Sequence, residues 1–259
     1  MALLEVRDIV MRFGGVTAVA GVSFDVEDRQ ICGLIGPNGA GKTTLFNVIS
    51  GIYRPTEGEI RFNGTVTTGL PRHRMAGLGI GRTFQNLALF RSMTVRDNVL
   101  SGAHCLGQGG FLGAALRLPS ARREEAEAAA RARTLLALLG LEQVAGIPVA
   151  GLPFGTQKRV EMARALISGP KLLLLDEPAG GLNHGEVDGL AELLHDIRQQ
   201  FDLAILLVEH HMNLVMRVSD KVVALDFGRK IADGTPHEVR SDPEVIRAYL
   251  GEDSHAAAA

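Results

Sequence analysis

The sequence predicts an α/β fold with a mostly parallel central sheet, an antiparallel β region near the N-terminus and a helical region. Short apolar runs, QICGLIG (30–36), KLLLLDEP (171–178) and LAILLVEH (203–210), alternate with helical segments, which is typical of buried parallel strands. The first third alternates apolar and polar residues between turn residues, which favours antiparallel strands. The stretch from about 91 to 168 is nearly all helical in pattern.

The strongest predicted helix is SARREEAEAAARARTLLALLG (120–140), which Ser120 can cap and Gly140 can end. We expect one domain over residues 1–259 with two parts and a flexible tail. These are a core with its β region (1–90 and 169–250), a helical subdomain (91–168) and the tail (251–259).

Composition restricts the possible partners and location. The 259 residues carry a formal net charge of −2, which gives no general attraction to nucleic acid or acidic membranes. The two cysteines offer no metal-binding spacing and fit a reducing cytosol. The charged N-terminus excludes a signal-peptide core, and the longest apolar runs are far shorter than a membrane span.

The segment GPNGAGKT (36–43) follows a buried strand and opens a helix, which is the context that a phosphate-binding loop requires. Its glycines let backbone amides surround phosphate oxygens, its lysine brings a positive charge, and its threonine hydroxyl can bind Mg²⁺. The sequence therefore predicts a P-loop (RecA-like) core that binds phosphate groups together with Mg²⁺. Its predicted nucleotide-binding residues are Gly36, Pro37, Asn38, Gly39, Ala40, Gly41, Lys42, Thr43 and Thr44.

Two adjacent carboxylates emerge at the carboxyl end of the strand LLLLDE (172–177), where ligands bind in α/β folds. Neighbouring side chains on an extended chain point in different directions, so the two need not share one role. Asp176 is placed to hold Mg²⁺ together with Thr43. Glu177 is placed to activate a water molecule for attack on a γ-phosphate.

Several classes of phosphate-loop protein remain possible at this point. A GTPase would also carry an N-K-x-D motif, which this sequence lacks, and a small-molecule kinase leaves the N-terminal β region unexplained. The decisive feature is an ordered set of motifs. After the phosphate loop come Gln85 in GIGRTFQN, then LPFGTQKRVEMARAL (152–166), LLLLDEP, AGGLN (179–183) and VEHH (208–211).

In this order the motifs resemble the ATP-binding subunit of an ABC transporter over residues 3–250. The resemblance implies that two ATPase subunits face each other and that each ATP lies between one phosphate loop and the other subunit's signature loop. The helix that carries Lys158 and Arg159 near its start would then face a second chain's γ-phosphate. Binding of ATP would close the pair, and hydrolysis would release it.

The resemblance also implies roles for individual residues. Phe13 would stack on adenine, and Gln85 would contact Mg²⁺ or the attacking water. Glu177 would be the general base, and His210 would contact the γ-phosphate and orient the water, with His211 a bystander. Asn183 stands where the family usually has aspartate.

The signature loop departs from the family pattern LSGGQ. The serine that would donate a hydroxyl to the γ-phosphate is Pro153, which has no donor. Gly155, the Thr156 hydroxyl and the helix dipole remain as the predicted contacts, and one lost hydrogen bond to a charged group costs about 1.5–3 kcal/mol.

The insertion between about 102 and 132 and the ending DPEVIRAYLGE (242–252) resemble the longer ATPase of bacterial branched-chain amino acid importers. That resemblance implies a sister ATPase, two membrane permeases, an extracytoplasmic solute-binding protein, and a cytoplasmic subunit on the inner face of the membrane. The alternatives are an exporter ATPase, as in lipopolysaccharide export, and a soluble ABC ATPase without a transport role. The solute itself leaves no trace in the sequence.

Overall fold

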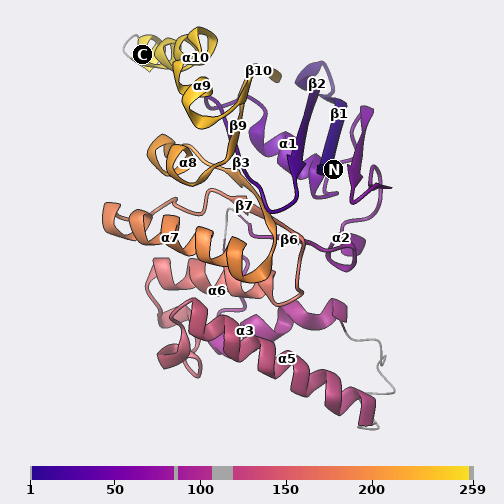
Figure 1. Cartoon of the computed structure of the whole chain (residues 1–259), viewed down its shortest axis with the longest axis vertical. Helices are drawn as coiled ribbons and strands as arrows, with labels where there is room; N and C mark the ends of the chain where they lie inside the picture. The colour runs from indigo at the N-terminus through magenta and orange to yellow at the C-terminus, as the bar shows by residue number, and fades with distance from the viewer. Residues whose placement is uncertain (1, 85–86, 107–118, 257–259) are drawn as a thin grey trace.

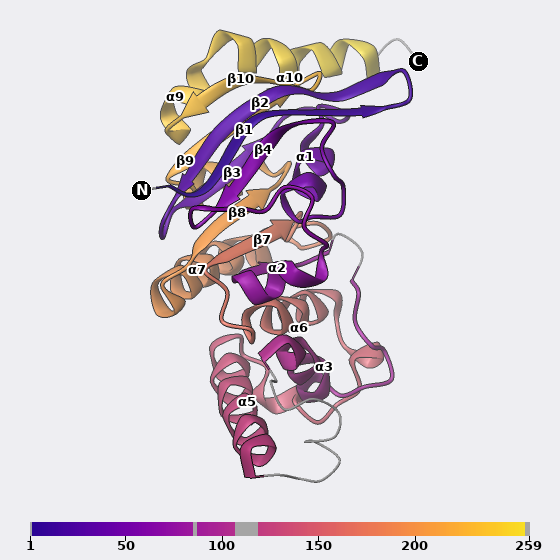
Figure 2. The same cartoon turned by 90° about the vertical axis from the view of Figure 1, so that its right-hand side faces the viewer.

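The computed structural model describes residues 2–84, 87–106 and 119–256 and contains two β-sheets (Figures 1 and 2). The first is antiparallel with the order β2-β1-β4-β5. Its strands are β1 (Ala2–Phe13), β2 (Val16–Glu27), β4 (Glu57–Phe62) and β5 (Thr65–Val66). This confirms the antiparallel region predicted from alternating apolar and polar residues.

The second sheet has the order β10-β9-β3-β8-β7-β6 and is parallel except for the edge pair β9–β10. Its strands are β3 (Ile31–Ile35), β6 (Ile80–Arg82), β7 (Leu172–Asp176), β8 (Ala204–Val208), β9 (Lys221–Asp226) and β10 (Arg229–Gly234). The predicted α/β class with a mostly parallel sheet is confirmed.

The central strands are buried on both faces because their side chains alternate between two cores. In β3, Ile31 and Ile35 enter one core and Cys32 and Leu34 enter the other. One core contains the first sheet and α1 (Lys42–Ile49), which lies between the two sheets. The phosphate-loop helix is therefore held on both sides by apolar packing.

Helices cover the opposite face of the parallel sheet and continue into a helical region, drawn at the bottom of Figures 1 and 2. Those against the sheet include α7 (His184–Phe201), α8 (Met212–Val218) and α9 (Pro236–Ser241). The helical region comprises α3 (Val95–Ser101), η1 (Gly102–Leu106), α5 (Pro119–Leu138), η2 (Glu142–Val144), η3 (Val149–Gly151) and α6 (Phe154–Leu166). The short helix α2 (His73–Leu78) precedes β6.

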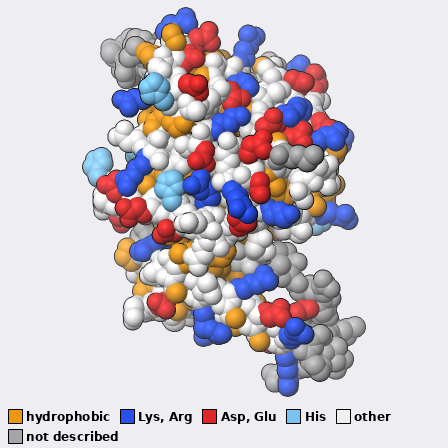
Figure 3. All heavy atoms as spheres, in the orientation of Figure 1, with side chains coloured by type: hydrophobic (Ala, Val, Ile, Leu, Met, Phe, Trp, Pro, Cys, Tyr) orange, Lys and Arg blue, Asp and Glu red, His pale blue; other side chains and the backbone are white. Residues whose placement is uncertain are grey.

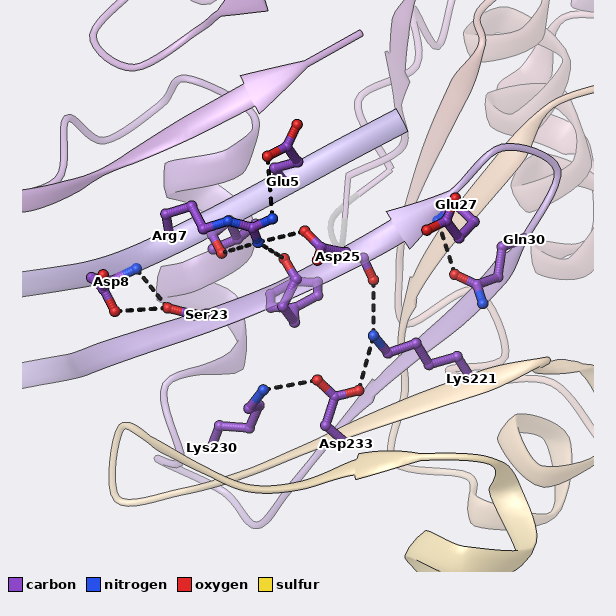
Figure 4. Close-up of polar contacts among 12 residues, drawn as sticks. Glu5, Arg7, Asp8, Ser23, Asp25, Glu27, Gln30, Lys221, Lys230 and Asp233 are labelled. Carbon is purple, nitrogen blue, oxygen red and sulfur yellow. Dashed lines mark hydrogen bonds and ion pairs between the residues drawn. The ribbon is translucent and has the colours of Figure 1, made fainter. Parts of the chain in front are cut away.

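Polar contacts fasten the first sheet to the hairpin of β9 and β10 (Figure 4). The Lys221 ammonium donates to the Asp25 backbone carbonyl at 3.1 Å and pairs with the Asp233 carboxylate at 2.9 Å. Lys230 pairs with the same carboxylate at 2.8 Å. On the neighbouring strands the Asp25 side chain pairs with Arg7 at 2.5 Å. The two sheets are thus joined by one lysine that reaches both.

Two helix boundaries differ from the sequence-based expectation. Helix α5 (Pro119–Leu138) already includes Pro119, so Ser120 lies inside the helix and not at its N-cap. Helix α10 (Pro243–Ala256) continues through residues 251–256 of the segment 251–259 that was expected to be a flexible tail. Among the described residues, every helix is too short or too polar to span a bilayer.

Acidic and basic side chains are interspersed over the face shown in Figure 3, with hydrophobic side chains between them, notably over the helical region. This distribution agrees with the near-zero net charge.

Candidate active site

The loop between β3 and α1 contains three glycines in backbone conformations that other residues rarely adopt. Gly36, Gly39 and Gly41 have φ values of 148°, 80° and 97°. A side chain at Gly36 would collide with the Leu225 carbonyl oxygen, and one at Gly41 would collide with that of Ala18. The loop is therefore packed against neighbouring backbone on one side and keeps its exposed residues, Asn38 and Gly39, on the other.

The Lys42 ammonium lies over this loop and donates to the carbonyl oxygens of Gly36 at 2.6 Å and Pro37 at 2.8 Å. Helix α1 begins at Lys42, has no acidic residue in its first turn and presents Thr43 at the surface. A helix N-terminus with this cation and no competing carboxylate suits a phosphate group. The loop geometry therefore fits ATP.

Asp176 ends β7 with its carboxylate only 3% exposed. Its partner is Arg82, whose Nη2 lies 3.6 Å from Oδ2 of Asp176. Burial raises the pKa of Asp176, and Arg82 only partly opposes that rise. Burial also lowers the pKa of Arg82.

Arg82 also donates to the Ser50 hydroxyl and, at 2.7 Å, to the Asn47 side-chain oxygen, and its guanidinium lies 4.7 Å from the Phe46 ring centroid. All three residues belong to α1 or its C-cap. The end of β7 and the phosphate-loop helix are thus connected through one side chain. A hard cation that prefers oxygen ligands, such as Mg²⁺, would be bound here by Asp176 and Thr43.

The structure brings together Glu177 and His210, for which the family resemblance implied the roles of general base and water-orienting residue. Oε1 of Glu177 lies 3.9 Å from Nδ1 of His210. Glu177 has a positive φ of 47°, which turns the chain sharply after β7, and its N–H donates to the Val208 carbonyl at 2.9 Å. Because the two strands end side by side, their last side chains meet at one edge of the sheet.

Glu209 is fully buried and holds this edge together. One carboxylate oxygen accepts from the Ala179 N–H at 2.6 Å, and the other accepts from the N–H groups of His210 at 3.0 Å and His211 at 3.2 Å. This carboxylate thereby fixes the chain after β7 and the chain after β8. The sequence analysis assigned it no role.

Phe13 lies at the end of β1, is 42% exposed and packs edge-on against Tyr53 with ring centroids 5.4 Å apart. A half-exposed aromatic face is suited to stacking on a flat base. Tyr53 was missed in the sequence because an isolated tyrosine in a loop carries no motif.

The signature loop leads into α6, which begins at Phe154 with Pro153 at its N-cap. Lys158 donates at 2.7 Å to the backbone carbonyl of Glu177, and burial lowers its pKa. Arg159 donates at 3.3 Å to the Leu139 carbonyl and at 3.5 Å to the Thr156 hydroxyl. The two cations at the start of this helix thus make contacts inside their own chain.

The two other predicted loop positions have different outcomes. Asn183 forms a capping box with Glu186 at the start of α7, since Asn183 Oδ1 accepts from the Glu186 N–H at 3.0 Å. Asparagine serves this role as well as aspartate does, which explains the departure from the family residue. Gln85 lies outside the described residues, so its predicted role stays a prediction.

A sequence profile described as ABC transporter matches residues 19–180. The chain belongs to the ABC transporter family. A second profile, described as branched-chain amino acid ATP-binding cassette transporter, matches residues 229–255, which span β10, α9 and most of α10.

Three relatives cover nearly the whole chain. The branched-chain amino acid transport ATP-binding protein BraF of Pseudomonas aeruginosa is 45% identical over 96% of this chain and 98% of its own. The lipopolysaccharide export ATP-binding protein LptB of Haemophilus influenzae is 32% identical over 97% of this chain and 98% of its own. The ADP conformation of the ATP-binding cassette MJ1267 superposes with a TM-score of 0.84 at 31% identity, over 97% of this chain and 99% of that one. The fold is therefore that of an ABC ATPase cassette.

Besides Glu209 and Tyr53, the structure adds two further site residues that were not singled out in the sequence. Arg82 links Asp176 to α1, and Tyr249 on α10 accepts a hydrogen bond from the Gly36 N–H at 2.8 Å. Tyr249 stands 213 positions from Gly36 in the chain. Only the C-terminal motif DPEVIRAYLGE pointed to its segment, and nothing in that motif indicated a contact with the phosphate loop.

Proposed function

We propose that this protein is the ATP-hydrolysing subunit of an ABC importer for branched-chain amino acids or related small solutes. The proposal depends above all on one arrangement: the Glu177 carboxylate lies 3.9 Å from the His210 imidazole at the edge of the sheet that also carries the phosphate loop. The 45% identity to BraF and the C-terminal family match favour branched-chain amino acids as the solute class.

In the proposed reaction Glu177 accepts a proton from the attacking water, and His210 orients that water against the γ-phosphate, with Gln85 as a further contact. Lys42 and the loop amides stabilise the charge that develops on the phosphate oxygens. Asp176, Thr43 and Gln85 would hold Mg²⁺, which would neutralise negative charge on the β- and γ-phosphates. Phe13 and Tyr53 hold the adenine, and Gly155 and Thr156 meet the ATP of the facing subunit.

Transport by this mechanism requires partners. We propose a second ABC ATPase subunit, two membrane permeases and an extracytoplasmic solute-binding protein. The subunit itself would be peripheral on the cytoplasmic face of the membrane. An exporter role, as named for LptB, is the second candidate, since that relative is similar over its full length. The lower identity of 32%, against 45% to BraF, makes it the weaker one.

The test is the molar mass of Glu177→Gln in solution, measured by light scattering with and without Mg-ATP. Loss of the general base should trap ATP between two subunits, so the mass should double with ATP if this chain pairs with itself. If the chain binds ATP and stays monomeric, the same measurement is repeated with the sister ATPase present. The control is Glu125→Gln on α5, which removes an exposed carboxylate far from the site.

ATP hydrolysis by Glu177→Gln at the parent rate would contradict the assigned base. Absence of any ATP-dependent assembly, alone or with the sister subunit, would contradict the proposed closure. Co-purification of the parent protein with permeases from membranes, and not with ribosomes, would separate a transporter from a soluble ABC ATPase.

A further inference from the structure

The end of β8 carries a group of metal-binding side chains that the ATPase chemistry uses only in part. Ligand atoms of Glu209, His210 and His211 all lie within 4.8 Å of one another. In the part of the chain that the structure describes, this is the one group of three or more histidine, cysteine or acidic residues with such spacing. Two of the three donors are imidazoles.

The carboxylate of this group is already positioned. Glu209 is fully buried, and three backbone N–H groups hold its two oxygens, as described above. A carboxylate offers about four acceptor sites, so one remains for a further ligand. Since the chain has already buried and oriented this anion, a metal ion would meet a preformed donor.

The two histidines are more accessible than the carboxylate. The His210 side chain is 53% exposed, and His211 is partly buried at the N-cap of α8, where its side chain makes no capping hydrogen bond with the described helix. Their rings lie 4.4 Å apart with an interplanar angle of 35°. The lone pairs of imidazole nitrogens lie in the ring plane, so one of the two histidines would have to change its side-chain rotamer for both rings to face one ion.

A fourth donor lies next to the group. Nδ1 of His210 is 3.8 Å from Oε2 of Glu209 and 3.9 Å from Oε1 of Glu177. Two donors on one tetrahedral Zn²⁺, with bonds of about 2.0–2.1 Å, are separated by about 3.3 Å. The separation between Nδ1 of His210 and Oε1 of Glu177 therefore needs to shorten by about half an ångström. Oε2 of Glu209 already accepts two N–H groups, so the metal ligand from Glu209 would be Oε1.

The donor set also selects the metal. Two imidazoles with one or two carboxylates suit Zn²⁺, whereas Mg²⁺ prefers oxygen ligands and keeps several waters. The site is therefore chemically distinct from the Mg²⁺ position at Asp176 and Thr43. Millimolar Mg²⁺ in an ATPase assay would not fill it.

We propose that Glu209, His210 and His211, with Glu177 as the fourth ligand, form a zinc-binding site that inhibits the ATPase. Zinc bound here holds the imidazole of His210 and the carboxylate of Glu177 away from the attacking water. The inhibitory part rests on the proposed function of those two residues; the binding part rests on geometry alone. His211 distinguishes the two chemistries, because it is a ligand of the metal and a bystander in hydrolysis.

Binding is tested first, without nucleotide. Zn²⁺ is titrated into the full-length protein by calorimetry, and Co²⁺ is used as a spectroscopic probe of tetrahedral coordination. We expect one ion per chain, and at least a 10-fold weaker binding in His211→Ala. The matched control is His237→Ala, which removes an exposed histidine on α9 and should bind as the parent does. No binding by the parent below about 100 μM Zn²⁺, or equal binding by His211→Ala, would overturn the site.

Inhibition is tested next, with excess Mg-ATP and free Zn²⁺ fixed by a metal buffer. Each variant is compared with its own zinc-free rate. We expect the parent and His237→Ala to lose most of their activity at zinc concentrations that fill the site, and to recover it with a chelator. His211→Ala should need at least 10 times more zinc. Inhibition of His211→Ala at the parent concentration would overturn the inhibitory role, even where binding had been confirmed.

These outcomes separate this proposal from the proposed function. A protein that binds zinc through His211 but hydrolyses no ATP would keep the metal site and overturn the ATPase assignment. An active ATPase that zinc does not inhibit would keep the ATPase assignment and overturn the inhibitory role of the metal site.

Discussion

The N–H of Gly36 donates a hydrogen bond of 2.8 Å to the hydroxyl of Tyr249, so the C-terminal helix is attached directly to the first residue of the phosphate loop. Gly36 in turn presents its carbonyl to Lys42. The conformation of this loop therefore depends on a side chain near the opposite end of the chain. The matched family profile at 229–255 includes Tyr249.

Tyr249→Phe should weaken ATP binding about 2- to 10-fold, because a net hydrogen bond contributes about 0.5–1.5 kcal/mol and its loss leaves the Gly36 N–H unpaired. Calorimetric titration with a non-hydrolysable ATP analogue measures this. Ile246→Ala, on an exposed position of the same helix, is the control and should bind ATP normally. An unchanged affinity for Tyr249→Phe would show that the loop keeps its shape without the tyrosine.

Arg82→Met should lower the free energy of unfolding by about 3–5 kcal/mol, since it leaves the buried Asp176 carboxylate without its cation. Urea unfolding measures the change. Arg29→Met is the matched control because the Arg29–Asp202 pair is exposed, with side chains 64% and 59% accessible, and should cost less than about 1 kcal/mol. Adding Asp176→Asn to Arg82→Met should restore much of the loss. Equal costs for Arg82→Met and Arg29→Met would contradict this interpretation.

Gly41→Ala and Gly39→Ala separate steric clash from backbone strain. Both positions have positive φ, so each substitution should cost about 1–2 kcal/mol of strain. The new methyl group meets nothing within 4 Å at Gly39 but collides with the Ala18 carbonyl at Gly41. Gly41→Ala should therefore be about 1–3 kcal/mol less stable than Gly39→Ala, as measured by chemical unfolding. Equal stabilities would mean that α1 can move away from β2 without cost.

Cys32 should make the protein sensitive to alkaline pH. Burial raises the pKa of its thiol from the ordinary value of 9.0 to about 12. The folded state then holds a proton that the unfolded state loses, so the stabilisation is complete below pH 9 and declines between pH 9 and about 12. Between pH 8 and pH 10 the parent should lose about 1.4 kcal/mol more than Cys32→Ala does. Parallel pH dependence of the two proteins in urea unfolding would exclude this origin.

The sequence predicted the fold and the edge of the sheet where the site lies because its signals are local. Apolar runs mark β3, β7 and β8, and GPNGAGKT requires the turn that Gly36 and Gly41 make. The contact between Glu177 and His210 was not predicted; it arises because β7 and β8 end side by side. Local signals cannot reveal contacts made by side chains from distant segments, and for this reason Arg82, Tyr53 and Tyr249 were missed.

The positive charges at the start of α6 show the same limit. From the sequence, Lys158 was expected to face a phosphate held by another chain. The sequence could not indicate that Lys158 donates at 2.7 Å to the Glu177 carbonyl of its own chain. The burial that lowers the pKa of Lys158 arises from packing between α6 and the end of β7. The proposed role of Gly155 and Thr156 toward a facing subunit stays a prediction.

The hydrogen bond from Lys158 to the Glu177 carbonyl connects the helical region to the backbone of the proposed base. A movement of α6 away from the sheet would break this bond and leave the Glu177 backbone held by two others, its own N–H to the Val208 carbonyl and the Gly180 N–H to its own carbonyl. The position of α6 and the alignment of the proposed base are thus coupled through the Lys158–Glu177 contact. A membrane partner that moves the helical region would therefore change the rate of hydrolysis without touching the nucleotide.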